Sequence, residues 1–299
     1  MKVVIAGGTG FIGQKITSLL KEKGHDIVIL TRSKRPNEKN IEYVQWLTDG
    51  SKPEEEILSA DAFINLAGVS INDGRWTPDH QQQIYDSRMV ATDELIRIIS
   101  ALQSKPTIFL NASAIGIYPA SETTIYSEAS RDVADDFLGK TVHDWEQKAA
   151  TLQAQGIRTA IMRFGVVLGK DEGALPLMSM PYKLFVGGKV GSGRQWVSWV
   201  HVQDVANAAV FLLEHASAQG VFNITAPFPL RMNDFGKTIG NVLHRPHWLP
   251  APAFLMKSAL GQKSALVLEG QYVSSEKIVT AGFDFEFPVL ADALNDLLK

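Results

Sequence analysis

The sequence predicts an α/β protein built on a doubly wound parallel sheet, with a smaller C-terminal lobe for substrate. Over the first two thirds of the 299 residues, short apolar runs alternate with longer amphipathic runs, the pattern of strands joined by crossover helices. This alternation ends after Arg163, where residues 165–196 carry seven glycines and little periodicity. Loops folded over a site explain that stretch better than another strand and helix.

The first strand is the apolar run Val3 to Ala6, and a glycine-rich turn follows it directly. The spacing Gly-x-x-Gly-x-x-Gly lies between a strand and an amphipathic helix, the context of a dinucleotide-binding Rossmann fold. Missing Cβ atoms permit the tight turn and let a pyrophosphate approach the backbone, while the helix N-terminus faces the phosphates. We expect the cofactor to contact Gly7, Thr9, Gly10, Phe11, Ile12 and Gly13.

The remaining elements follow from the same periodicities. Further strands are expected at 26–30, 41–46, 62–66, 107–112, 159–164, 196–201 and 221–224. Helices are expected at 11–23, 53–58, 78–101, 132–155 and 202–215. We therefore predict an NADP-binding domain of residues 1–166 plus 197–225 and a substrate lobe of residues 167–196 plus 226–299. Ligands of such sheets bind at the carboxyl ends of the strands, so the cleft between the lobes is the expected substrate site.

The end of the second strand indicates which cofactor is bound. An acid about 20 residues after the glycine turn selects NAD, whereas an arginine there accommodates the 2′-phosphate of NADP. This chain has no acid there and instead reads Thr31-Arg32-Ser33-Lys34-Arg35. Arg32 and Ser33 are therefore predicted to bind NADP(H); the alternative is a solvated basic loop.

Composition narrows the function further. A net charge of −3 gives no global attraction to nucleic acid or an anionic membrane. There is no cysteine, and no cluster of His, Asp or Glu has the spacing of metal ligands, so no metal is expected. The first strand leaves no room for a cleavable signal peptide, and we expect a cytoplasmic protein with a small-molecule substrate. Nothing in the sequence predicts the oligomeric state.

Several motifs together resemble a known family over essentially the whole chain. They are the glycine turn, Asn65-Leu66-Ala67-Gly68, Ser113 to Tyr118, Arg163-Phe164-Gly165 and Trp199 to Asp204. These resemble the extended short-chain dehydrogenases/reductases, and more narrowly the atypical epimerase family (nucleoside-diphosphate-sugar epimerase-like, family 39U). Gly270 to Val273 and Gly282 to Phe285 resemble that branch's C-terminal domain of unknown function. The resemblance implies further cofactor contacts from Leu66, Ala67, Gly68, Arg88, Ala112, Phe164, Gly165 and Val166.

One departure from that family matters for chemistry. The family implies a tyrosine and, four residues later, a lysine that lowers the tyrosine pKa so that it exchanges a proton as hydride moves. Those two positions fall here on Leu138 and Val142, and the usual serine position falls on Ala114. Lys140 is no substitute, because two residues along a helix point roughly 200° apart. The usual acid and its activator are therefore both missing.

Other groups are candidates for the missing proton donor. Tyr118 and Ser113 are the nearest hydroxyls, although a tyrosine there also packs over cofactors and a serine there also bonds backbone. Arg88 lies on the helix that passes the nicotinamide in related folds, where it would bind phosphate, polarise a carbonyl or form a plain salt bridge. Water is the remaining candidate.

Residues of the later loops are further candidates for the substrate site, each with a structural alternative. Arg75, Arg194 and Gln195 are expected over the cleft, where they would hold an anionic substrate or simply face solvent. His201 and Asp204 resemble a catalytic dyad, but we expect both to be structural, with Asp204 capping the following helix. Trp196, Trp199 and Phe254 either line a pocket or pack in the core.

Two functions therefore remain open. The first is an NADP-dependent, epimerase-like oxidoreductase acting on a small carbonyl or sugar-derived molecule. The second is a non-catalytic NADP(H)-binding sensor or scaffold. The lost tyrosine and lysine favour the second, whereas the retained glycine-rich lobe favours the first.

Overall fold

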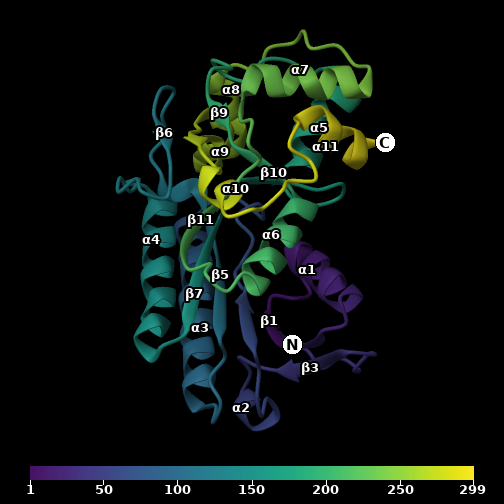
Figure 1. Cartoon of the computed structure of the whole chain (residues 1–299). Coiled ribbons are helices and arrows are strands. Elements are labelled where there is room, and N and C mark those ends of the chain that lie inside the picture. The colour runs from purple at the N-terminus through teal and green to yellow at the C-terminus, as the bar shows by residue number, and fades with distance from the viewer.

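The computed structural model describes all residues from Met1 to Lys299 and contains a seven-stranded sheet (Figure 1). Its strand order is β11-β7-β5-β4-β1-β2-β3, and every neighbouring pair is parallel. The strands are β1 (Lys2–Ala6), β2 (Asp26–Thr31), β3 (Ile41–Gln45), β4 (Ala62–Asn65), β5 (Ile108–Ala114), β7 (Arg158–Phe164) and β11 (Gly220–Ile224). The chain builds outward from β1 in both directions, so the predicted doubly wound sheet is confirmed.

Helices cover both faces of this sheet, as its two-sided burial requires. They are α1 (Phe11–Glu22), α2 (Pro53–Glu56), α3 (Pro78–Ala101), α4 (Phe137–Ala150) and α6 (Val202–Glu214). Alternate residues of β1 point to opposite faces: Val3 and Ile5 share one core with α1 and α6, while Val4 and Ala6 share the other with α3 and α4. Figure 1 shows these two helix layers on either side of the sheet. None of the helices combines the length and the apolar content that crossing a membrane demands.

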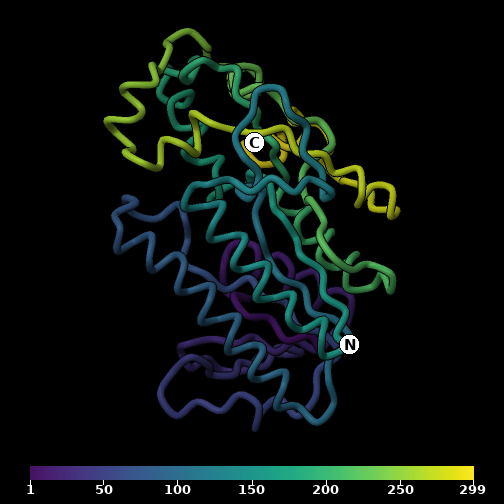
Figure 2. Tube along the Cα trace, turned by 90° about the vertical axis from the view of Figure 1, so that its left-hand side faces the viewer, coloured from purple at the N-terminus to yellow at the C-terminus, as the bar shows by residue number.

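The second lobe lies beyond the carboxyl ends of the strands (Figure 2). Its helices are α5 (Leu175–Lys183), α7 (Met232–Leu243), α8 (Ala253–Leu260), α9 (Ala265–Leu268), α10 (Glu276–Thr280) and α11 (Leu290–Leu298). Short strands pair as β10 (Trp199–His201) with β8 (Val166–Leu168), β12 (Leu230–Arg231) with β9 (Trp196–Val197), and β13 (Tyr272–Val273) with β6 (Ile125–Tyr126). The chain also has three 3-10 turns: η1 (Ile115–Ile117) after β5, η2 (Thr151–Gln155) after α4, and η3 (Gly261–Ser264) after α8. A separate core that includes Trp199, Phe235 and Leu294 holds this lobe together.

Two expected elements differ from the observed ones. The helix expected at 132–155 begins only at Phe137, because the Asp136 carboxylate accepts the Gly139 N–H at 2.7 Å and caps it. The single strand expected at 196–201 is two strands, because the chain changes partners at Ser198. The Ser198 carbonyl accepts the Val166 N–H at 2.8 Å, and its hydroxyl donates to the Gln271 carbonyl at 2.9 Å.

Candidate cofactor and substrate site

Gly7, Gly10 and Gly13 follow β1, and a different structural feature explains the glycine at each position. Gly7 adopts φ +81°, and a Cβ there would lie 2.8 Å from the Leu66 carbonyl. A Cβ on Gly13 would collide with the Gly7 carbonyl oxygen, so this glycine lets α1 pack against the turn. A Cβ on Gly10 would meet only the Gly7 oxygen, at 3.4 Å. The outer face of Gly10 is therefore open, as a site for close approach by a pyrophosphate requires.

The first turn of α1 lies directly behind this opening. Gly10 is its N-cap, no side chain caps it, and no acid occupies the first turn. The free N–H groups and the positive end of the helix dipole therefore face the open side of the turn. The Phe11 ring packs against Gly169 and Gly173, in the loop that follows β8.

The basic residues after β2 are exposed and have no acidic partner. None of Arg32, Lys34 and Arg35 forms an ion pair. Ser33 donates its N–H to Thr31 Oγ1 at 3.3 Å, which bends the chain where the strand ends. A hollow of about 390 Å³ lies beside this turn, lined in part by Thr9 and Arg35. Arg35, which has no ion pair, lines this hollow together with Thr9 of the glycine turn, and such a cation suits a 2′-phosphate.

The turns after β4 and β7 complete the edge of the sheet. Asn65 fixes the first one, because its Oδ1 accepts the Ala67 N–H at 3.1 Å while its Nδ2 donates to Asn111 at 2.8 Å. Leu66 and Ala67 are partly exposed and Gly68 is exposed at this edge, as are Gly165 and Val166 in part. Ala112 and Phe164, also expected to contact the cofactor, are 6% and 8% exposed, and their side chains pack in the core. Their side chains face the helices and not the cleft.

Comparisons with known proteins identify the family to which this chain belongs. A sequence profile described as the NAD dependent epimerase/dehydratase family matches residues 3–225. The chain belongs to this family. A second profile, a domain of unknown function (DUF1731), matches residues 251–297.

Relatives of similar length carry the family name. The chain is 47% identical to epimerase family protein YfhF of Bacillus subtilis, over 100% of this chain and 98% of that protein. It is 40% identical to epimerase family protein SERP0438 of Staphylococcus epidermidis, over 100% and 99%. It is also similar to a crystal structure of human epimerase family protein SDR39U1 with NADPH, at 31% identity and TM-score 0.89 over 99% of both chains. A nucleoside-diphosphate sugar epimerase from Corynebacterium glutamicum, 25% identical with TM-score 0.78, is longer, and this chain covers 58% of it.

The positions that the resemblance assigns to the family's tyrosine, lysine and serine hold apolar side chains. Leu138, at the usual tyrosine position, lies near Gly116, where a Cβ would be 3.6 Å from the leucine Cβ. Val142, one helical turn later at the usual lysine position, is 5% exposed. The partly exposed Ala114 adds no hydroxyl. These three side chains have no proton to exchange.

Tyr118 and Ser113 do not fill that gap. The Tyr118 hydroxyl is 2.9 Å from Asn223 Oδ1 and 3.0 Å from the Ser127 carbonyl, and it accepts a hydrogen bond from Arg163 Nη1 at 2.7 Å. The Ser113 hydroxyl donates to Glu146, which pairs with Arg163. Tyr118 and Ser113 are 2% and 3% exposed. Both hydroxyls therefore belong to a buried polar network, which does not suit the proposed role of proton donor to a substrate.

Asn223 is the member of this network that sequence reasoning missed. It is a buried amide within the otherwise apolar strand β11, and its Nδ2 donates to the Ser274 carbonyl at 3.1 Å. A single polar residue in an apolar strand was the available signal, since such a group needs partners when buried.

The later candidates separate into exposed and structural residues. Arg75 is exposed on the loop before α3, whereas Arg194 pairs with Glu122 at 2.6 Å. Gln195, expected over the cleft, is 4% exposed and donates to the Val267 carbonyl at 2.7 Å. It joins two loop segments and is not offered to a substrate.

His201 and Asp204 are structural, as expected, but Asp204 does not cap its own helix. Its carboxylate accepts the Glu286 and Phe287 N–H groups at 2.7 and 3.0 Å, which fastens the C-terminal segment to α6. His201 Nδ1 accepts the Gln203 N–H at 3.0 Å, and its Nε2 lies 3.2 Å from Asp296. Among the aromatic candidates, Trp199 is fully buried, Arg231 covers Trp196, and Phe254 is 69% exposed.

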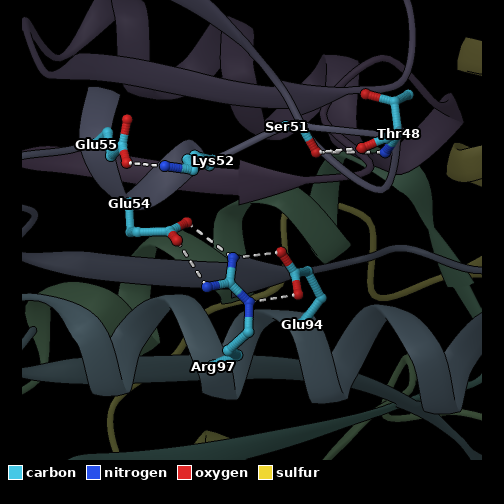
Figure 3. Close-up of polar contacts among 7 residues, drawn as sticks. All are labelled: Thr48, Ser51, Lys52, Glu54, Glu55, Glu94 and Arg97. Carbon is cyan, nitrogen blue, oxygen red and sulfur yellow. Dashed lines mark hydrogen bonds and ion pairs between the residues drawn. The ribbon is translucent and has the colours of Figure 1, made fainter.

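A larger hollow of about 540 Å³ lies elsewhere, beside α2 at the end of the molecule away from the second lobe (Figure 1). Figure 3 shows its polar residues already paired: Arg97 binds Glu54 and Glu94, with N–O distances of 2.7 and 2.8 Å. The Arg97 hydrogen bond lowers the pKa of Glu54 to about 2. The cations of this surface, Arg97 and Lys52, are both paired with glutamates, so it offers no free positive charge to a phosphate. The structure contains no group of three or more His, Cys, Asp or Glu that could hold a metal ion.

Proposed function

We propose that this chain binds NADP(H) and catalyses an epimerase-like oxidoreduction of a small carbonyl or sugar-derived molecule. One observation carries the proposal: the open face of Gly10 and the uncapped α1 N-terminus belong to a glycine turn that borders a hollow lined by Arg35, a cation with no acidic partner. Only an anionic ligand with a pyrophosphate and a further phosphate uses all three features. The human relative crystallised with NADPH supports this choice.

The chain's own residues would divide the cofactor between them. The glycine turn would bind the pyrophosphate, while Arg32 and Ser33 would bind the 2′-phosphate. Ala67, Gly68 and the Gly165 turn would lie along the nicotinamide half at the carboxyl ends of β4 and β7. The bound cofactor supplies or accepts the hydride. Leu138 and Val142 would exclude water from one side of that position, which leaves Arg88 or a water molecule to stabilise the substrate oxygen.

The second candidate function is a non-catalytic NADP(H)-binding sensor or scaffold. The apolar side chains of Leu138, Val142 and Ala114 favour it, because general acid catalysis is worth about 10²–10⁴-fold in rate. Both functions expect the same cofactor site, so cofactor binding alone does not separate them.

Two measurements test the proposal. Titration with NADPH and with NADH, followed by cofactor fluorescence, should give tighter binding of NADPH; equal affinities would contradict the NADP assignment. A panel of carbonyl compounds with NADPH and of nucleotide sugars with NADP⁺, followed by the change in NADPH absorbance, should then yield at least one substrate. NADPH binding with no turnover across the panel would support the sensor function instead.

A further inference from the structure

Arg88 is a partly buried arginine with no acidic partner. It lies within α3, and its guanidinium carbon is 5.2 Å from the centre of the Trp145 ring. Its Nη1 donates to the Ile84 carbonyl at 2.8 Å and to the Val69 carbonyl at 3.1 Å. Arg163 and Arg97, by contrast, each pair with at least one glutamate. The positive charge of Arg88 is therefore held in place by neutral groups alone.

One edge of the guanidinium is free. Nη1 makes both protein hydrogen bonds, and neither Nε nor Nη2 has a partner within the protein. Neither atom is among the polar atoms that are buried without a partner, so both remain in contact with solvent. The N–H groups of Nε and Nη2 point the same way, and this edge matches the two oxygens of a carboxylate.

The surroundings favour an anion with a single charge. Burial lowers the pKa of Arg88 to about 10, and no acidic side chain forms an ion pair with it. The side chain stays positive near neutral pH, and an anion bound beside it would offset the cost of its burial. A phosphate monoester would favour a second cation, which this site does not have.

Arg88 also lies where substrate is expected. Its Cζ is 3.1 Å from the position of a Cβ on Gly68, which follows β4 at the carboxyl edge of the sheet. Trp145, beneath the guanidinium, is three residues after Val142 on α4 and therefore on the same face. Arg88 therefore packs against the face of α4 that carries the positions where the family's tyrosine and lysine are missing.

We propose that the Nε and Nη2 edge of Arg88 binds a carboxylate, so that the substrate of this protein is a small carbonyl compound that is also a carboxylic acid. This inference rests on the proposed function for the placement of the reacting carbonyl beside the nicotinamide. The carboxylate on Arg88 would orient that carbonyl, a task that the tyrosine hydroxyl performs in other members. A phosphate of the cofactor is also an anion that this edge would bind. The experiment therefore distinguishes a substrate carboxylate from a cofactor phosphate.

The experiment uses the full chain saturated with NADP⁺ and measures binding of probe molecules by saturation-transfer NMR. The probes are 2-oxo carboxylic acids of about three to six carbons, each compared with its methyl ester, which has the same shape without the charge. The wild-type protein should bind at least one acid about tenfold or more tightly than its ester. Arg88→Gln should abolish that preference, and Arg88→Lys, which keeps the charge but not the two-pronged edge, should retain only part of it.

Controls separate the possible outcomes. Arg131→Gln removes an exposed positive charge from another loop and should leave the preference unchanged. The proposal replaces the cofactor contact that the resemblance implies for Arg88, so Arg88→Gln should keep NADPH affinity within about twofold. A large loss of NADPH affinity would show that the anion is a cofactor phosphate and would overturn the proposal. Equal binding of acids and esters, or no binding of either, to a wild-type protein that binds NADPH would also overturn it. Failure of the wild-type protein to bind NADPH would instead refute the proposed function.

Discussion

The Arg163 guanidinium holds the Glu146 carboxylate in a two-pronged ion pair, with Nε to Oε1 at 2.7 Å and Nη2 to Oε2 at 2.6 Å. Both residues are largely buried, at 7% and 8% exposure. The pair joins α4 to β7 and also holds Tyr118 and Ser113. It therefore connects α4, β5, β7 and the segment after β5 through one buried polar network.

Glu146→Gln should destabilise the fold strongly, because it leaves the buried Arg163 charge without its partner. We expect a loss of about 3–5 kcal/mol in the free energy of unfolding, measured by urea denaturation. The matched control is Glu94→Gln, which removes one of two acids from the more exposed Arg97 and should cost less than about 1 kcal/mol. Similar losses in the two variants would refute this account of the buried pair.

Tyr118→Phe should reduce stability and leave the chemistry alone. The substitution removes a hydroxyl that contacts Arg163, Asn223 and the Ser127 carbonyl, so a loss of about 1–3 kcal/mol in the free energy of unfolding is expected. NADPH affinity and the turnover of any substrate found should stay within about twofold of wild type. A tenfold fall in turnover at unchanged stability would restore Tyr118 as a proton donor.

Arg32→Ala should remove most of the preference for NADPH over NADH. Loss of a charge-assisted hydrogen bond to the 2′-phosphate is worth about 1–3 kcal/mol, and NADH has no such phosphate. Fluorescence titration should therefore show weaker NADPH binding and unchanged NADH binding in the same variant. Equal weakening for both cofactors would mean that Arg32 contacts a part that they share.

Gly10→Val and Gly13→Val should fail in different ways. The face of Gly10 is open, so Gly10→Val should fold but lose NADPH binding by steric exclusion of the pyrophosphate. In Gly13→Val the new Cβ collides with the Gly7 carbonyl, so the melting temperature should fall. Unchanged NADPH affinity in Gly10→Val would show that the phosphates lie elsewhere.

Asp204 predicts a pH dependence of stability. Burial raises its pKa to about 6, above the value of about 3.9 in an unfolded chain. The folded state therefore holds the proton more tightly, and the associated stability is complete below about pH 4 and is lost as the pH rises through about 6. Between about pH 5 and about pH 7, the wild type should lose about 1 kcal/mol relative to Asp204→Asn. If the difference in the free energy of unfolding between the two proteins, measured by urea denaturation, stays constant across this pH range, the effect is excluded.

The sequence by itself determined the order and type of most elements and the place of the cofactor turn. Strands with period two and helices with period 3.6 are local patterns, and the Gly7 to Gly13 turn lies within a few residues of the strand and helix that it joins. The absence of an acid near Arg32 and the loss of the Tyr and Lys pair were also visible, because each depends only on which residue occupies one position.

Only the tertiary structure decided which candidate side chains face the cleft. Tyr118 is turned into the core by Asn223, 105 residues later, and by Arg163, while Gln195 is held by a carbonyl 72 residues away. Arg88 keeps a free edge because its only protein partners are two backbone carbonyls, both bound by Nη1. Burial and charge pairing depend on neighbours that the fold brings together from distant parts of the chain, and no pattern within a short window of sequence contains that information.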